Sequence, residues 1–479
     1  MSTVKPPGAS PMSADFIAYC CYPRPRFELS LLRFGLAILG ICALLVPVTG
    51  TAAQSQSVLG LSEILYDIAG KSPDVLAALA EQRKAKARVG QARASWFGTA
   101  DVYGLSQHYN DPRLLRPITS PPNIANYPFA SDQLSYGIEF NLPLDVSLRI
   151  AAEVDAARAS AHAARWNADD ARLRVLLNGA TLYRDLQALN GRRMALNRQS
   201  DALVASVRVA NAGVRAGTFS KLKRLRLEAA LAEVRAVRAG VEGAIRKLRA
   251  QLAALMGKSR LGGAIAQLTS PPTQLPASGG FLSTPRVQAA RSALRASQGK
   301  LSAARRSLLP QFFINGRWNE NAIQQGYAHR IHTWQVGLGV KLNLWSGGGQ
   351  VSAIDAASAS ETVARERLRE ARFALRAARE AASAQWQAGQ QAYAAAQTGL
   401  DAALQSARIE RGNFRAGLGS ATDLLDAEAA LAQARSALTS SLASWWQADA
   451  TLRYAYGETP LTMKSGVSPQ GPIRGVQSQ

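Results

Sequence analysis

Cysteine is scarce in this sequence of 479 residues, and its three copies, at positions 20, 21 and 42, all lie near the N-terminus. The rest of the chain can therefore form neither a disulfide nor a cysteine-ligated metal site. Histidine is also scarce, and no H-E-x-x-H arrangement is formed by His108, His162, His329 and His332. The glycine run at Ser346 lacks the Gly-Lys-Ser/Thr of a phosphate-binding loop. We therefore expect no metal, no cofactor and no enzymatic activity.

The N-terminal segment is typical of an export signal. Basic residues up to Arg33 precede a short apolar run, Leu36–Val46, and the small residues that follow end at Ala53. The run is too short for a membrane-spanning helix. We expect residues 1–53 to be a signal peptide. We expect no lipid anchor, because Cys42 lies inside the apolar run.

The net charge of +23 invites the hypothesis of a nucleic-acid partner. Two features argue against it. The cations are scattered through alanine-rich helical sequence among Asp and Glu, and the chain carries an export signal. We therefore expect solvated helix faces and no nucleic acid.

Two segments 200 residues apart are near copies, "RAGTFSKLKRLRLEAALAEVR" and "RAGLGSATDLLDAEAALAQAR". Further matches at the same separation indicate two structural repeats. The copies differ in charge, because Lys223 and Arg226 in the first occupy the places of Asp423 and Asp426 in the second.

Each repeat contains a segment in which apolar and polar residues alternate strictly, over 134–144 and 334–344. Period two predicts a β-strand with one apolar face. Weaker strands are expected before them, over 100–109 and 312–319, so that each repeat holds one hairpin. Five prolines between Asn110 and Gln133 predict a long surface loop, and "HRIH" is expected in the second hairpin loop.

The remaining sequence predicts helices with coiled-coil seams. A stretch without proline follows each hairpin, over about 145–212 and 350–412, and each would be roughly 100 Å long as one helix. Shorter helices are expected over about 60–96, 218–256 and 419–456.

The first repeat is expected over 54–256, with its hairpin at 99–144, and a linker follows over 257–283. The second repeat is expected over 284–457, with its hairpin at 311–344, and a tail follows over 458–479.

Four amphipathic strands cannot close a barrel alone, and unpaired strand edges are not tolerated in lipid. A cyclic oligomer could combine strands from several chains, and three chains would supply twelve. The same symmetry would combine the helices into a tube. The sequence therefore predicts a mainly helical chain with four membrane strands, assembled into a channel.

The chain resembles the TolC-like outer-membrane efflux protein family over nearly all of residues 58–457. The resemblance is carried by the duplicated hairpin-and-helix plan, by "VGLGVKLNLWSGG", and by "FRAGLGSATDLLDAEAALAQAR". It implies a homotrimer with a 12-stranded β-barrel in the outer membrane and a 12-helix α-barrel tunnel in the periplasm. It also implies two partners, a periplasmic adaptor protein and an inner-membrane transporter, in efflux or type I secretion.

The resemblance further implies that Asp423 and Asp426 form rings that narrow the tunnel entrance. Phe414 stands where the family has a tyrosine, and Gly419 where it has an arginine. The candidate gate partners are Lys223, Arg226, Phe414 and Arg415. The small residues expected to contact the adaptor are Ala216, Gly217, Thr218, Ala416, Gly417 and Leu418.

Simpler explanations exist for these residues: two aspartates on a solvated helix face, and glycines that permit a tight turn between helices. An alternative function is a periplasmic coiled-coil adaptor or scaffold without a pore, which would lack the paired alternating strands. The sequence does not distinguish drug, metal, peptide and protein cargo.

Overall fold

The structure is a computed structural model that describes residues 58–115, 129–272, 284–323 and 330–460. These residues all belong to one of the two units into which the chain divides, Ser55–Gln479. The predicted signal peptide and most of the predicted tail lie outside the described residues.

Each repeat contains one very long helix followed by a helix about half as long. In the first repeat these are α3 (Arg149–Arg215) and α4 (Lys221–Leu255). In the second they are α6 (Gly349–Arg415) and α7 (Ala421–Ala455). The long helices have 67 residues each and the shorter ones 35. Both long helices end three residues beyond the expected positions, 212 and 412.

The segment expected to form one helix over about 60–96 forms two. Helix α1 (Leu61–Lys71) ends before Ser72, and α2 (Pro73–Ala94) begins at the next residue. Ser72 is extended, with ψ of 129°. Proline disfavours the helical conformation in the residue before it and is well suited to a first helical position. The helix α5 (Pro285–Arg306) of the second repeat also begins with proline.

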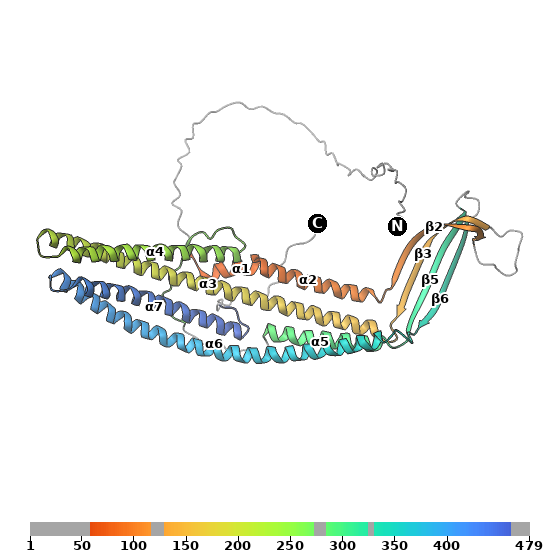
Figure 1. The fold of residues 1–479 in the computed structure, drawn as a ribbon. Coiled ribbons are helices and arrows are strands. Elements are labelled where there is room, and N and C mark those ends of the chain that lie inside the picture. The colour runs from red at the N-terminus through yellow and green to blue at the C-terminus, as the bar shows by residue number, and fades with distance from the viewer. Residues whose placement is uncertain (1–57, 116–128, 273–283, 324–329, 461–479) are drawn as a thin grey trace, which may run out of the picture. The chain divides into compact units, whose positions relative to one another are not determined.

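The helices run alongside one another, with α3 in the interior of the set (Figure 1). Helix α3 contacts α2, α4, α5 and α7, whereas α6 contacts α5 and α7. Burial agrees with this difference, because buried residues occur along most of α3 but are few on α6: Ala364, Leu368, Ala371, Ala382, Ala407 and Phe414. Helix α6 therefore lies at an edge. No helix in the described ranges combines the length and hydropathy needed to cross a bilayer.

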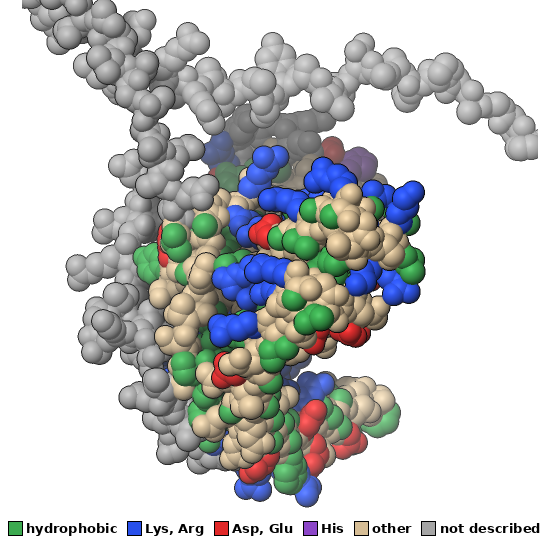
Figure 2. Space-filling model, turned by 90° about the vertical axis from the view of Figure 1, so that its left-hand side faces the viewer, with side chains coloured by type: hydrophobic (Ala, Val, Ile, Leu, Met, Phe, Trp, Pro, Cys, Tyr) green, Lys and Arg blue, Asp and Glu red, His purple; other side chains and the backbone are tan. Residues whose placement is uncertain are grey.

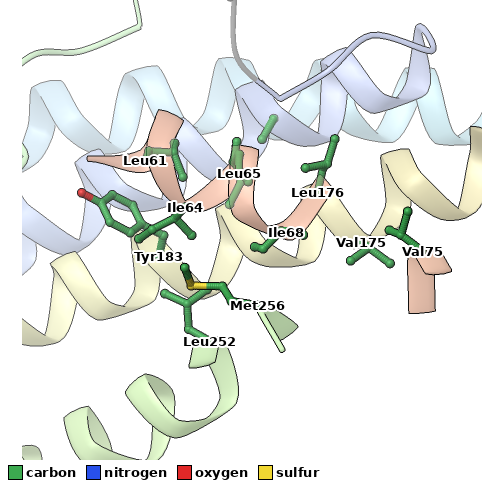
Figure 3. Packing of buried hydrophobic residues seen from close by; sticks show 12 residues of the cluster. Leu61, Ile64, Leu65, Ile68, Val75, Val175, Leu176, Tyr183, Leu252 and Met256 are labelled. Carbon is green, nitrogen blue, oxygen red and sulfur yellow. The ribbon is translucent and has the colours of Figure 1, made fainter. Parts of the chain in front are cut away.

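A hydrophobic core forms where α1 packs on the middle of α3 and the end of α4 (Figure 3). Ile64 and Ile68 of α1 are fully buried, as are Leu252 of α4 and Met256, which follows it. The hydroxyl of Tyr183 donates a 2.9 Å hydrogen bond to the carbonyl oxygen of Leu59. This core fixes α1 beside the two helices of the first repeat.

Leu59 belongs to a two-stranded parallel sheet of β1 (Val58–Leu59) and β4 (Ala264–Ile265). Strand β4 lies in the segment over 257–283, for which only a linker was expected. Two residues per strand are too few to produce a detectable alternation in the sequence.

The larger sheet is antiparallel, with the order β2-β3-β5-β6. Its strands are β2 (Thr99–Leu114), β3 (Phe129–Leu144), β5 (Gln311–Ile323) and β6 (Arg330–Lys341). The two hairpins therefore join through β3 and β5, where Tyr136 lies opposite Glu320. Strands β2 and β6 form the edges.

The first hairpin corrects the expectation of a loop over 110–133, because β2 continues to Leu114 and β3 begins at Phe129. Pro112 is tolerated since β2 is an edge strand, and the register shifts between His108 and Arg113. The part of that loop over 116–128 lies outside the described residues.

The second hairpin also differs from expectation. Strand β6 ends at Lys341, three residues before the expected end at 344. Residues 330–332 of "HRIH", expected in a loop, belong to β6, where His332 lies opposite Glu320. The four residues of "HRIH" are too few to show an alternation of apolar and polar residues, so the sequence did not predict that β6 begins there. His329 lies outside the described residues.

Candidate functional site: the two helical turns

The helix pairs α3–α4 and α6–α7 are joined by turns of the same design at the end remote from the sheet. Gly217 and Gly417 have positive φ angles of 75° and 81°, which glycine adopts without strain. The side chains of Ser220 and Ser420 then cap the following helices, accepting hydrogen bonds from the backbone N–H groups of residues 223 and 423 at 3.3 and 3.1 Å.

The six residues predicted to contact an adaptor lie in these two turns and are exposed: Ala216, Gly217, Thr218, Ala416, Gly417 and Leu418. Thr218 and Leu418 hold equivalent places, and their backbone N–H groups each donate a 2.9 Å hydrogen bond to the preceding helix, at Gly213 and Asn413. The two turns therefore present small and apolar surfaces of similar backbone shape.

Asp423 and Asp426 lie at the start of α7, and both are exposed. Asp423 is in the first turn, where a carboxylate favourably faces the positive end of the helix dipole. Arg415, the last residue of α6, is also exposed.

The predicted cationic partners contact the same helix start through neutral groups. The Lys223 ammonium donates a 3.3 Å hydrogen bond to the carbonyl oxygen of Gly419. Arg226 Nη1 donates a 3.1 Å hydrogen bond to the Thr422 hydroxyl. Within the described residues of one chain, neither cation forms an ion pair with Asp423 or Asp426. Within one chain, the two repeats therefore meet at the turns through these contacts of Lys223 and Arg226 with neutral groups.

An aromatic contact between the repeats was not predicted. The rings of Phe219 and Phe414 lie 5.3 Å apart at 55°. Phe414 is 2% exposed, and Lys223 Nζ lies 4.8 Å from the centre of the Phe219 ring. The signal was present in the alignment of the repeats: Phe414 matches Val214, and Phe219 matches Gly419. Each turn thus supplies one aromatic ring, from a different position.

A buried ion pair between Arg411 and Glu428 was also missed. The guanidinium of Arg411 donates to both carboxylate oxygens of Glu428, at 2.5 and 2.7 Å. Glu428 is 2% exposed. The hydrogen bonds to this carboxylate raise the pKa of Arg411. This bidentate pair joins α6 to α7 close to the turn.

Within the described ranges, no group of three or more His, Cys, Asp or Glu side chains could hold a metal ion.

The sequence matches a family model described as "Outer membrane efflux protein" over residues 64–258 and 282–458. No curated protein matches the chain. Among solved structures, it is similar to the outer membrane protein VceC from Vibrio cholerae, with 20% identity and a TM-score of 0.70 over 84% of this chain and 97% of that chain. It is also similar to the outer membrane channel MtrE of Neisseria gonorrhoeae in its open state, with 19% identity and a TM-score of 0.69 over 83% of this chain and 89% of that chain. For the outer membrane channel CmeC of Campylobacter jejuni, the identity is 16% and the TM-score 0.71, over 83% of this chain and 85% of that chain.

Proposed function

Because the chain belongs to the outer membrane efflux protein family, we propose that it is the exit duct of a tripartite efflux pump or a type I secretion system. It would receive substrates from an inner-membrane transporter through a periplasmic adaptor and release them outside the cell. The family is one of outer-membrane channels and not of enzymes. Membership also favours the channel over the alternative of a periplasmic adaptor without a pore.

The open edges of the sheet carry the proposal of a homotrimer. Each edge strand, β2 or β6, pairs on one side only within the described residues. In lipid, such edges need partners. Three copies arranged around an axis would pair β6 of one chain with β2 of the next and close a sheet of twelve strands. The exposed apolar residues of β6, at 334, 336, 338 and 340, would then face lipid.

The same symmetry would place the sparsely buried helix α6 beside α2 and α4 of the next chain, forming a periplasmic tube. Native mass spectrometry of the purified channel in detergent tests the assembly. We expect three copies, and a stable monomer would contradict the proposal.

The two aspartates of α7 are proposed as the gate of this tube. Three copies each of Asp423 and Asp426 would form carboxylate rings that attract cations and bind divalent ions. Their exposure in the single chain supports this proposal, because these side chains are available to face an axis. Lys223 and Arg226 would hold the start of α7 in place, and an adaptor would contact the six exposed turn residues.

Planar-bilayer recording tests the gate. Asp423→Ala combined with Asp426→Ala should raise single-channel conductance and weaken block by divalent cations, since six carboxylates leave the axis. Asp401→Ala, which removes an exposed carboxylate of α6 far from the turn, is the control and should change neither property. Unchanged conductance and block in the double variant would show that the aspartates lie on a solvated helix face.

A further inference from the structure

Arginine side chains gather around a cavity between the two repeats. The cavity has a volume of about 370 Å³ and is lined by Arg198 and Asp201 from α3, Arg411 and Arg415 from α6, and Arg435 from α7. We call it the arginine pocket. Seen from the end of the bundle that carries the turns, Lys and Arg side chains also outnumber acidic ones on the upper half of the face (Figure 2).

The charges of the arginine pocket are not balanced. Glu428 compensates Arg411 through the bidentate pair, and Asp201 is the one acid in the lining. In the described part of the chain, the side chains of Arg198, Arg415 and Arg435 form no ion pair or hydrogen bond. Four guanidinium groups therefore face two carboxylates, which leaves two positive charges uncompensated.

The arginines also repel one another. Burial, followed by the charges of Arg198 and Arg411, lowers the pKa of Arg435. Like charges held close together are unfavourable until a counter-charge enters. The lining also includes the apolar side chains of Phe414 and Leu424, and both are buried.

We propose that the arginine pocket binds a small dianion that carries a phosphate or a pair of carboxylates. The guanidinium fork matches both groups in bidentate geometry, and a charge of −2 would neutralise the pocket. Arg198 belongs to the first repeat, and Arg411 and Arg435 to the second. A bound dianion would thus bridge α3 to the α6–α7 pair, behind the turn that carries the two aspartates.

Isothermal titration calorimetry of the purified full-length channel tests this site, with inorganic phosphate, succinate and chloride as probes. We expect saturable binding of phosphate or succinate and none of chloride. Arg435→Gln should weaken binding roughly 10- to 100-fold, as expected for a lost charge-assisted bidentate contact. Arg435→Lys, which keeps the charge but not the fork, should fall in between.

Two further variants make the result specific. Arg198→Gln removes an exposed arginine that the fold does not need, and it should also weaken binding at least several-fold. Arg192→Gln removes another exposed arginine of α3, outside the pocket lining, and should leave binding unchanged.

Thermal unfolding gives an independent readout. Without added dianion, Arg435→Gln should not lower the midpoint, because it relieves repulsion. Phosphate should raise the midpoint of the parent channel and of Arg192→Gln more than that of Arg435→Gln. The proposal is overturned if neither dianion binds, or if Arg192→Gln and Arg435→Gln weaken binding equally. Binding of a glutamate-rich peptide without binding of phosphate or succinate would also overturn it, and would assign the pocket to a protein partner. None of these outcomes depends on channel conductance.

Discussion

Replacing Arg411 with methionine would leave the carboxylate of Glu428 buried without its partner. Both oxygens of Glu428 accept hydrogen bonds from Arg411 at 2.5 and 2.7 Å. Breaking a buried ion pair by removing one partner typically costs about 3–5 kcal/mol. The Arg411 side chain is 34% exposed, so water would reach the carboxylate in part. We therefore expect a cost of about 3 kcal/mol, at the lower end of that range.

The loss should appear as local opening of the α6–α7 pair near its turn. Native-state hydrogen exchange measures such opening directly. A cost of about 3 kcal/mol corresponds to roughly a hundredfold faster exchange of amides in the first turns of α7. Exchange in the hydrophobic core around α1 should not change.

The chain offers a matched control in the first repeat. Glu228 matches Glu428 in the alignment, but it lies 3.6 Å from Arg224 in a pair whose side chains are 43% and 36% exposed. Exposed pairs contribute at most about 1 kcal/mol, so Glu228→Gln should accelerate exchange in α4 less than about fivefold. The double variant Arg411→Met with Glu428→Leu should recover most of the loss, because no charge remains buried. If Arg411→Met accelerates exchange no more than Glu228→Gln does, the buried pair does not hold the two helices together.

Two further predictions concern contacts between distant segments. Phe219→Ala removes the ring that packs on Phe414 and should lower the free energy of unfolding by about 1–3 kcal/mol, measured by chemical denaturation; an unchanged value would show that the turns are held by their backbones alone. Hydrogen bonds from Lys258 and Lys71 lower the pKa of Asp67 below its ordinary value of 3.8. The Asp67 carboxylate therefore stabilises the fold fully at pH values above 3.8, and this stabilisation is lost as the pH falls through the lowered pKa. Asp67→Asn should therefore lower the thermal midpoint at pH 7 by an amount worth less than about 1 kcal/mol, and this difference should vanish in acid; a difference that persists in acid would contradict the linkage.

The long helices and the amphipathic strands could be predicted because their signals are periodic and extend over many residues. The prolines gave mixed guidance. Pro73 ends one helix and begins another, whereas Pro112 is accommodated in an edge strand. The sequence alone does not show which strands lie at the sheet edges. It therefore does not predict whether a given proline interrupts an element or is accommodated in an edge strand.

Contacts between the repeats were the least predictable part of the candidate site. The arginine pocket combines Arg198 with Arg435, which are far apart in the sequence and belong to different repeats. No local period links such residues. The alignment of the repeats marked the positions of Phe219 and Phe414 as different, but only the packing of the two turns shows that the rings meet.

The charge difference between the two turns does not arise from helix formation. Ser220 and Ser420 cap their helices through the backbone N–H groups of residues 223 and 423, so the side chains there are free to vary. The helix dipole favours an acid at this place, which suits Asp423 and disfavours Lys223 by about 0.3–1 kcal/mol. Lys223 offsets this cost by its hydrogen bond to Gly419, across the junction of the turns, and by its contact with the Phe219 ring of its own turn. The first repeat thus supplies a cation that holds the second, and the second keeps its acids free of partners within the described chain. This division of roles is what the proposed gate, a set of exposed carboxylates on a fixed support, requires.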